Sequence, residues 1–238
     1  CFAPIWLLAS FLATLAKEMP ETLHKLTGII ACSSSSFATK RFAYNTEDKQ
    51  LVSKLLTAHS SLQDLAKELS IPCQILAPTL VYGRVGNYTD KNISTIIRIL
   101  RRTPCIVLPQ QTGFRQPIHA TQLALAAMRQ TERMISSQWD RDAPEIITLG
   151  GDATITYEQM IRLIMSHLDR TDPARKCRIL LIPDRLFFIF MAPLLLLSPK
   201  MFEATMRIKS DLSGFTKAHE VTGGDPQDFP LLPLPSER

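Results

Sequence analysis

The segment 71–83 constrains the fold of this chain most, because it predicts a helix exit, a buried strand and a loop in direct succession. It reads Ile-Pro-Cys-Gln-Ile-Leu-Ala-Pro-Thr-Leu-Val-Tyr-Gly. Pro72 ends a preceding helix, the apolar residues after it form the strand, and Pro78 to Gly83 form the loop. A strand that is apolar throughout is typical of a parallel sheet with both faces covered.

Helical and apolar segments alternate around this strand, which predicts an α/β fold. In the first half we expect helices at 4–19 and 46–69 and strands at 28–32 and 74–78. The second half is expected to mix shorter elements and to end in irregular structure after Asp211. Its expected strands lie at 105–108, 116–118, 146–149 and 177–182, and its expected helices at 92–102, 120–133, 156–168, 185–197 and 200–210.

The composition is that of a globular protein, with 45% hydrophobic and 21% charged residues. The net charge is +5 and the basic residues are scattered. The densest group, Arg98, Arg101 and Arg102, has helical spacing and no interleaved aromatic residues. It therefore indicates a solvated helix face and argues against nucleic-acid binding. The same charge balance suits an anionic, phosphate-bearing ligand.

The five cysteines are widely spaced and include no C-x-x-C pair. Disulfide frameworks and zinc sites need clustered pairs, so we expect reduced thiols, no metal site and a cytoplasmic location.

The apolar segment 186–197 raises the question of a membrane. Its 12 residues reach only ~18 Å as a helix, against a hydrocarbon core of ~30 Å. A buried helix or a contact with the membrane surface fits the segment better than a span, so membrane association stays open beside the cytoplasmic assignment.

A second motif follows the loop of the first: residues 115–120 read Arg-Gln-Pro-Ile-His-Ala. Together the two segments resemble landmarks of the extended short-chain dehydrogenase/reductase family, which contains nucleotide-sugar epimerases and dehydratases. The resemblance runs from about Ala3 to Pro233. It implies a partial Rossmann-type parallel sheet with a small C-terminal α/β substrate lobe. Residues 1–88 would be the C-terminal part of an NAD(P)-binding domain, and 89–238 mainly the substrate-binding lobe, with some segments returning to the sheet.

The resemblance also implies a cofactor, NAD or NADP, and the residues that would touch it. The sequence has no G-x-x-G-x-x-G, the motif that lets the backbone approach the pyrophosphate. We therefore expect a fragment or truncated product that binds the dinucleotide poorly by itself. The implied cofactor-binding residues are Ala3, Pro4, Ser33, Ser34, Pro78, Thr79 and Tyr82.

The catalytic positions implied by the resemblance are altered. The family's Tyr-x-x-x-Lys places an acid/base and its partner on one helical face, and the two positions fall on Leu51 and Leu55. Lys54 is one residue off, and Tyr44 precedes the helix. Ser35 matches the family's catalytic Ser or Thr. The alternative interpretation of this serine loop is a polar turn and helix cap.

Arg115 matches an arginine that, in the family, grips the diphosphate of the substrate. A guanidinium suits phosphate because it donates in a fixed bidentate fork; a purely structural arginine is the alternative. His119 is expected to be a structural hydrogen-bonding residue. Thr121 and Gln122 stand where the family has two aspartates, which puts that supporting role in doubt.

The sequence is compatible with two functions. The first is an NAD(P)-dependent oxidoreductase or epimerase that acts on a nucleotide sugar or a related anionic metabolite. An epimerase is an isomerase, and the resemblance is to bacterial proteins. The second is a non-catalytic dinucleotide-binding sensor or scaffold that has lost its Tyr and Lys. By analogy with the family, the helix at 46–69 would pair two copies as a homodimer.

Overall fold

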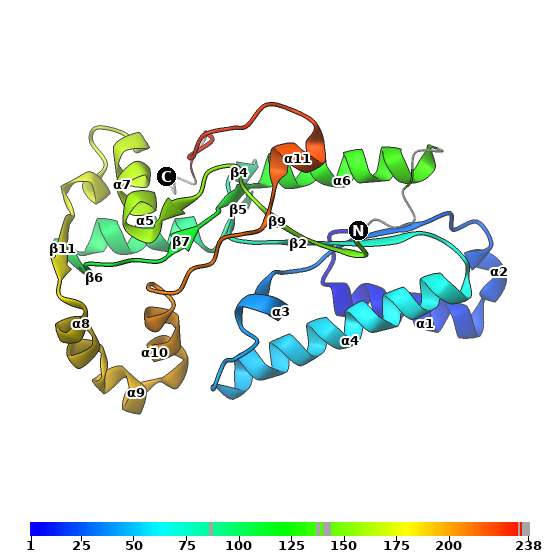
Figure 1. The fold of residues 1–238 in the computed structure, drawn as a ribbon, viewed down its shortest axis with the longest axis horizontal. Helices are drawn as coiled ribbons and strands as arrows, with labels where there is room; N and C mark the ends of the chain where they lie inside the picture. Colours follow the sequence, from blue (N-terminus) through cyan, green and yellow to red (C-terminus); the bar gives the residue numbers. More distant parts are fainter. Residues whose placement is uncertain (86–87, 137–138, 140–143, 233, 235–238) are drawn as a thin grey trace. The chain divides into compact units, whose positions relative to one another are not determined.

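The structure is a computed structural model that describes residues 1–85, 88–136, 139, 144–232 and 234 (Figure 1). The chain divides into two compact units. Unit 1 contains residues 1–79, 123–149 and 216–223, and unit 2 contains residues 80–122, 150–215 and 224–238. Segments from the second half of the chain thus return to unit 1. The cofactor-binding and substrate-binding roles expected for the two halves stay predictions.

Unit 1 is built on one sheet with the strand order β1-β2-β9-β12. The strands are β1 (Ile29–Cys32), β2 (Cys73–Pro78), β9 (Ile146–Gly150) and β12 (Thr216–Lys217). β1 and β2 are parallel, with Ile29 opposite Cys73, and β2 and β9 are parallel, with Ile75 opposite Ile146. The predicted α/β class with a parallel sheet is confirmed.

Helices cover both faces of this sheet, as the apolar strands require. Figure 1 shows α1 (Ile5–Glu18) and α4 (Thr46–Glu68) on one face of β2 and β9, and α6 (Ala120–Ile135) on the other. Burial of each large aliphatic side chain in such a core contributes about 1.5–3 kcal/mol. The fully buried large residues of the α1–α4 layer are Ile5, Leu55, Leu62 and Ile75. The described residues of the unit also include the short helices α2 (Pro20–Leu23), α3 (Ser36–Thr39) and α11 (Ala218–Thr222).

α4 begins and ends where its sequence predicts. Asn45 is the N-cap and its side chain accepts a hydrogen bond from the backbone N–H of Asp48. Two acidic residues in the first turn stabilise the helix, because their negative charges lie near the positive end of the helix dipole. After Glu68 the chain turns through Ser70, whose φ is 56°, and reaches Pro72, which cannot continue the helix.

The described residues of unit 2 form four two-stranded sheets. β3 (Val81–Tyr82) runs parallel to β8 (Ile118–His119), and β6 (Cys105–Pro109) runs parallel to β11 (Arg178–Ile182). β7 (Phe114–Arg115) and β10 (Ile155–Thr156) are antiparallel, as are β4 (Arg84–Val85) and β5 (Tyr88–Thr89). The helical elements are α5 (Ile93–Arg102), α7 (Tyr157–His167), the 3-10 helix η1 (Pro173–Lys176), α8 (Asp184–Met191), α9 (Pro193–Leu197) and α10 (Pro199–Met206).

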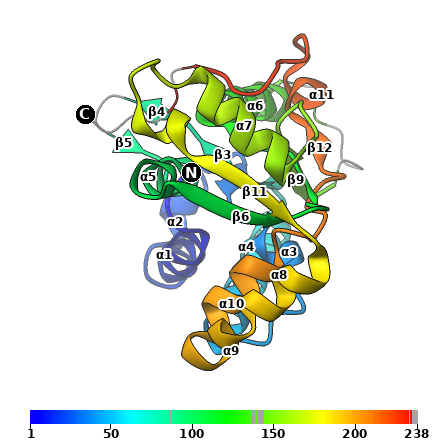
Figure 2. The same cartoon turned by 90° about the vertical axis from the view of Figure 1, so that its left-hand side faces the viewer.

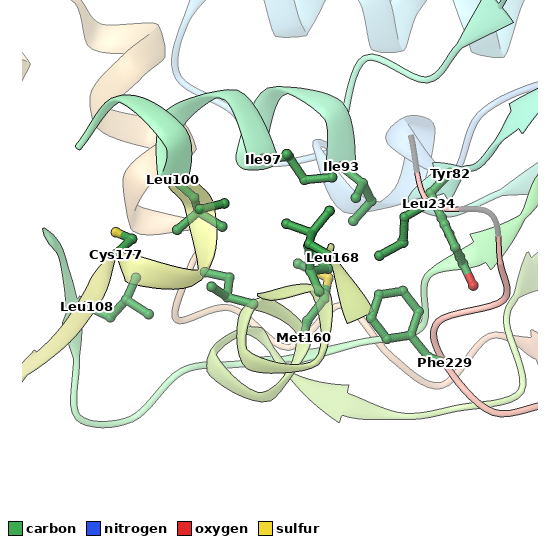
Figure 3. Packing of buried hydrophobic residues seen from close by; sticks show 13 residues of the cluster. Tyr82, Ile93, Ile97, Leu100, Leu108, Met160, Leu168, Cys177, Phe229 and Leu234 are labelled. Atoms are coloured by element: carbon green, nitrogen blue, oxygen red, sulfur yellow. The ribbon is translucent and has the colours of Figure 1, made fainter. Parts of the chain in front are cut away.

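The core of unit 2 lies between α5, α7 and the tail of the chain (Figure 3). Ile93, Ile97 and Leu100 recur on one face of α5 and are almost completely buried. The ring of Tyr82 packs edge-on against Phe229, with centroids 5.1 Å apart. In the last turn of α5, Arg101 forms an ion pair with Asp172, with Nη2 and Oδ2 2.7 Å apart.

Three expectations in the second half of the chain are wrong. The strand expected at 116–118 is divided into β7 and β8. The helix expected at 185–197 is broken into α8 and α9, because Pro193 lacks the N–H that a continuous helix needs. The tail after Asp211 is not irregular: it adds β12 to the sheet, forms α11 and buries Phe229.

Candidate functional site

The carboxyl ends of β1 and β2 bring the predicted serine loop and the Pro78–Thr79 segment together in unit 1. The backbone N–H of Ser33 donates to Leu76 O at 2.7 Å, and that of Ser35 donates to Pro78 O at 2.9 Å. Thr79 in turn donates to Leu149 O at 2.9 Å. The carboxyl edge of a parallel sheet is where ligands bind in open α/β folds.

Ala3 and Pro4 lie beyond the same edge. The amino group of Cys1 donates to Ile30 O at 2.6 Å, and the N–H of Cys32 donates to Cys1 O at 2.9 Å. This is the hydrogen-bond pattern of a parallel bridge on the outer side of β1. Because the chain runs in the direction of β1, the residues after Cys1 reach the carboxyl edge before α1 begins. Six of the seven predicted cofactor residues therefore gather at one edge of unit 1.

Ser33 forms a pair with a histidine that sequence reasoning missed. The Oγ of Ser33 lies 2.7 Å from the Nε2 of His59, and His59 is 2% exposed. The ring of His59 meets that of Phe37 edge-on at 5.1 Å. Burial lowers the pKa of His59 below its ordinary 6.5, so the imidazole is neutral at pH 7. Its Nδ1 is buried and has no hydrogen-bond partner among the described residues.

A sequence signal for His59 exists in the spacing of α4. His59 lies four residues after Leu55 and eight after Leu51, so the three side chains share one helical face. Leu55 is 2% exposed in the core, and Leu51 packs against the same cluster. Neither leucine can act as an acid or a base. The titratable residue of this face is His59, one helical turn after Leu55.

Ser35 occupies the N-cap position of α3, yet its hydroxyl makes no capping hydrogen bond. The local turn is held instead by Ser34, whose Oγ donates to the Oγ of Ser36 at 2.9 Å and accepts from the N–H of Ser36 at 3.2 Å. The loop is thus a polar turn, as the alternative interpretation has it, but the turn does not employ Ser35 as a cap. The catalytic role of Ser35 stays a prediction.

An ion pair between the half-buried Lys40 and the buried Asp48 links α3 to α4. Lys40 Nζ lies 2.7 Å from Asp48 Oδ1, and Asp48 is 2% exposed. Asn45 Nδ2 donates to the second carboxylate oxygen at 3.0 Å. The pair anchors the chain just after the serine loop. Tyr44, one residue before the cap, is 87% exposed.

Unit 1 also contains a cavity of about 320 Å³. Most of the residues that line it are aliphatic, and two are threonines, Thr27 and Thr131. A ligand site needs convergent polar groups to fix orientation, and this cavity has few. The lining residues are Cys1, Leu8, Leu12, Leu26, Thr27, Gly28, Ile29, Ile30, Thr131, Met134 and Ile135.

The two predicted site residues of unit 2 are held inside that unit. Tyr82 is 1% exposed and its hydroxyl accepts a hydrogen bond from the N–H of Leu231 at 2.9 Å. Burial raises the pKa of the Tyr82 hydroxyl to about 12, so the hydroxyl is protonated near pH 7. Cofactor binding by Tyr82 stays a prediction.

Arg115 is 6% exposed, and its guanidinium donates hydrogen bonds to carbonyl groups just after the end of α10. Nη1 donates to Phe114 O and to Ser210 O, both at 2.6 Å, and Nη2 donates to Arg207 O. Its carbon Cζ lies 5.3 Å from the ring centroid of Tyr157. These contacts correspond to the structural alternative. A substrate phosphate would meet a guanidinium whose two terminal nitrogens already bind carbonyl oxygens, and phosphate binding stays a prediction.

His119 is positioned by Thr121 and Gln122. The backbone N–H of His119 donates to Gln122 Oε1 at 3.0 Å, and the ring Nδ1 of His119 lies 2.7 Å from Thr121 Oγ1. The Nε2 is buried without a hydrogen-bond partner among the described residues. Burial lowers the pKa of His119, and Asp90 opposes that shift. Gly83 lies directly against the ring, because a Cβ there would be 2.5 Å from Nε2.

Within residues 1–85, 88–136, 139, 144–232 and 234, no group of three or more His, Cys, Asp or Glu side chains could hold a metal ion. In those ranges no helix combines the length and the apolar character that crossing a bilayer requires.

No family model matches the chain, and no curated protein matches it. Solved structures do. RMD from Pseudomonas aeruginosa, in complex with NADPH, gives a TM-score of 0.51 at 13% identity, over 91% of this chain and 67% of that one. UDP-glucuronic acid 4-epimerase from Bacillus cereus, in complex with UDP-glucuronic acid and NAD, gives 0.54 at 16% identity, over 94% and 62%.

A third structure is TunA, an NAD-dependent NDP-hexosamine 5,6-dehydratase involved in tunicamycin biosynthesis. It gives a TM-score of 0.50 at 11% identity, over 91% of this chain and 66% of that one. At such identities the likeness concerns the fold. The chain shares its fold with these three proteins, and it spans 62–67% of their length.

Proposed function

We propose that this chain is part of an NAD(P)-dependent oxidoreductase or epimerase that acts on a nucleotide sugar or a related anionic metabolite. One observation carries the proposal: the parallel sheet of unit 1 gathers Ser33–Ser35 and Pro78–Thr79 at its carboxyl edge. The solved structures support it, because proteins of the same fold were determined with NADPH, with NAD and with UDP-glucuronic acid.

The donor set at this edge fits a nicotinamide dinucleotide. The loop offers the hydroxyl of Ser35, and the hydroxyls of Ser33 and Ser34 can each make a further hydrogen bond besides those to His59 and Ser36. Such hydroxyls can donate to and accept from a ribose or a carboxamide. The bound cofactor would supply the hydride chemistry. The protein's part would be to hold the nicotinamide end against the sheet edge.

We also propose that residues 1–238 alone bind the cofactor weakly. The nine glycines never form G-x-x-G-x-x-G, so the backbone cradle for a pyrophosphate is not among these residues. If the protein made from the natural reading frame contains such a motif, the proposal predicts that this protein binds NADH clearly more tightly than residues 1–238 do. Equal affinity of the two proteins for NADH would contradict it.

Ser35 is the proposed catalytic hydroxyl, and the Ser33–His59 pair is proposed to position the loop that carries it. A neutral His59 can hold the Ser33 hydroxyl by donating or accepting at Nε2. Ser33 also bonds through its backbone to β2, so the pair links α4 to the carboxyl edge.

The test is turnover of UDP-sugars by the product of the natural reading frame, followed as epimer formation or as a change in reduced cofactor. Ser35→Ala should lower kcat by at least about 100-fold, the contribution typical of a positioned proton-transfer group. Ser53→Ala, an exposed serine on α4, is the matched control and should leave kcat unchanged. Equal rates for Ser35→Ala and the control would exclude the catalytic role.

The alternative is a dinucleotide-binding sensor or scaffold without turnover. Leu51 and Leu55 favour it, because the resemblance places the family's Tyr and Lys at these two positions and both side chains instead pack against the apolar core. Saturable quenching of protein fluorescence by NADH, with no product from any UDP-sugar tested, would support the sensor. Turnover that Ser35→Ala abolishes would support the enzyme.

The homodimer also stays a proposal, and α4 is the element concerned. Its outward side exposes Lys54 and Leu56, the latter at 46%. Light scattering coupled to gel filtration should give twice the monomer mass, and Leu56→Glu should return the monomer. A monomer mass for the unmodified protein would contradict the proposal.

A further inference from the structure

The helices that follow β11 in unit 2 expose an unusual amount of apolar surface. We call this segment, residues 184–206, the α8–α10 segment; Figure 2 shows it as a run of three helices with α9 furthest from β6 and β11. Phe190 is 65% exposed, Leu196 90% and Leu197 80%. Single exposed apolar residues are ordinary, but a concentration of this size marks an interaction site. The remaining exposed members are Leu186, Phe188, Ile189, Leu195 and Met201.

The exposure of α8 is not confined to one side. Phe188, Ile189 and Phe190 are consecutive and all exposed, while Phe187 is the buried residue of the helix. Consecutive residues on a helix point about 100° apart, so apolar side chains leave α8 in several directions. A groove on a partner protein covers one face of a helix. A lipid interface can take up an apolar tip all round.

Basic residues are concentrated around this apolar tip. Residues 175–209 contain seven Lys or Arg and two Asp or Glu, a net charge of +5, which equals the net charge of the whole chain. Both acidic side chains face a basic one: Asp184 pairs with Lys209, and Glu203 lies 3.9 Å from Arg207. The five exposed basic residues of the segment and its approach are Arg175, Lys176, Arg178, Arg185 and Lys200.

We propose that the α8–α10 segment docks on an anionic phospholipid surface. The exposed Phe and Leu side chains would enter the boundary between headgroups and acyl chains, and the surrounding Arg and Lys would lie among the phosphates. α8 has 8 residues and α9 has 5, so the segment can lie in the interface but not cross it. This surface role is independent of the cofactor edge in unit 1.

The test is flotation of the full chain with vesicles in a density gradient, which separates vesicle-bound protein from aggregates. Vesicles of equal parts phosphatidylglycerol and phosphatidylcholine should carry the protein, and added salt should release part of it. Pure phosphatidylcholine should carry at least about tenfold less, because attraction to anionic headgroups is lost. Equal flotation with both vesicles, or none with either, would overturn the proposal.

A matched pair of triple variants assigns the binding to the segment. Phe190→Ser, Leu196→Ser and Leu197→Ser together should lower binding to the anionic vesicles by at least about tenfold. The control changes one Phe and two Leu of unit 1 that are 51–59% exposed, namely Phe11→Ser, Leu7→Ser and Leu125→Ser. The control should bind like the unmodified protein. A loss in the control equal to that of the segment variant would overturn the proposal.

A charge variant keeps the test decisive if the serine variant fails to fold. Arg185→Glu with Lys200→Glu leaves the apolar side chains in place and should reduce flotation with anionic vesicles only. Unchanged flotation would overturn the proposal. So would a mass of two copies in solution that the serine variant reduces to one, because the segment would then be an interface between copies of this chain.

Discussion

The predicted site residues fall into two regions that the fold treats in opposite ways. In unit 1 the serine loop lies at the carboxyl edge of a parallel sheet, where backbone hydrogen bonds from Ser33 and Ser35 hold it. In unit 2 the side chains of Tyr82 and Arg115 are themselves the hydrogen-bonding groups of the core. The comparison teaches that two motif positions can differ in what their side chains do. The main chain holds Ser35 in place and its hydroxyl makes no capping hydrogen bond, whereas the side chains of Tyr82 and Arg115 stabilise the fold themselves.

The largest effect on stability is expected at Arg115. Arg115→Met would leave the carbonyl oxygens of Phe114, Ser210 and Arg207 without their donor, and should lower the free energy of unfolding by about 3–5 kcal/mol. Urea unfolding followed by circular dichroism measures it.

The matched control for this change is Arg102→Met, at an exposed arginine, which should stay within about 0.5 kcal/mol. An Arg115 variant as stable as the control would mean that the guanidinium is not structural, and the contrast between the two units would fail.

The next largest effect is expected at Gly83. Gly83→Ala combines a φ of +124° with a Cβ placed 2.5 Å from Nε2 of the buried His119. Backbone strain and overpacking together should destabilise by about 2–4 kcal/mol. Gly214→Ala has a φ of +81° and nothing within 4 Å of the new Cβ, so strain alone should cost about 1–2 kcal/mol there. Thermal unfolding of both variants measures the difference, and equal losses would mean that the ring of His119 yields.

A smaller effect separates two serines of one loop. Ser33→Ala removes the partner of the buried His59 Nε2 and should cost about 1–3 kcal/mol. Ser35→Ala removes no capping bond and should cost about 0.5 kcal/mol or less. Equilibrium unfolding of the two variants compares them directly. A larger loss at Ser35 than at Ser33 would show that Ser35 is structural and would weaken its catalytic assignment.

The smallest effect is a dependence on pH. Because burial lowers the pKa of His59 below 6.5, the folded protein binds fewer protons than the unfolded chain between the two pKa values. The free energy of unfolding should therefore fall as the pH is lowered below about 6.5, by at most about 1.4 kcal/mol per pH unit for this group. His59→Leu should flatten this slope, leaving the part due to His119. An unchanged slope would place the acid sensitivity elsewhere.

Local signals predicted the first half of the chain well. The apolar face of α4 and the segment from Pro72 to Pro78 each specify an element through neighbouring residues. The parallel sheet then follows from their order.

Long-range partners explain what could not be predicted. The carbonyl groups that hold Arg115 come from residues 92 and 95 positions later in the chain, and Leu231 reaches Tyr82 across 149 positions. No local pattern announces such partners. His59 illustrates a second limit: a lone histidine on an apolar helix face becomes informative only when the loop that carries Ser33 folds against it.

The most direct test of the central claim is hydrogen–deuterium exchange of the product of the natural reading frame, with and without saturating NADH. If the carboxyl edge of unit 1 holds the cofactor, peptides covering 33–39 and 76–80 should exchange more slowly with NADH, while peptides covering 185–201 should not change. Saturation by NADH without any protection at 33–39 would contradict the claim that this edge is the cofactor site.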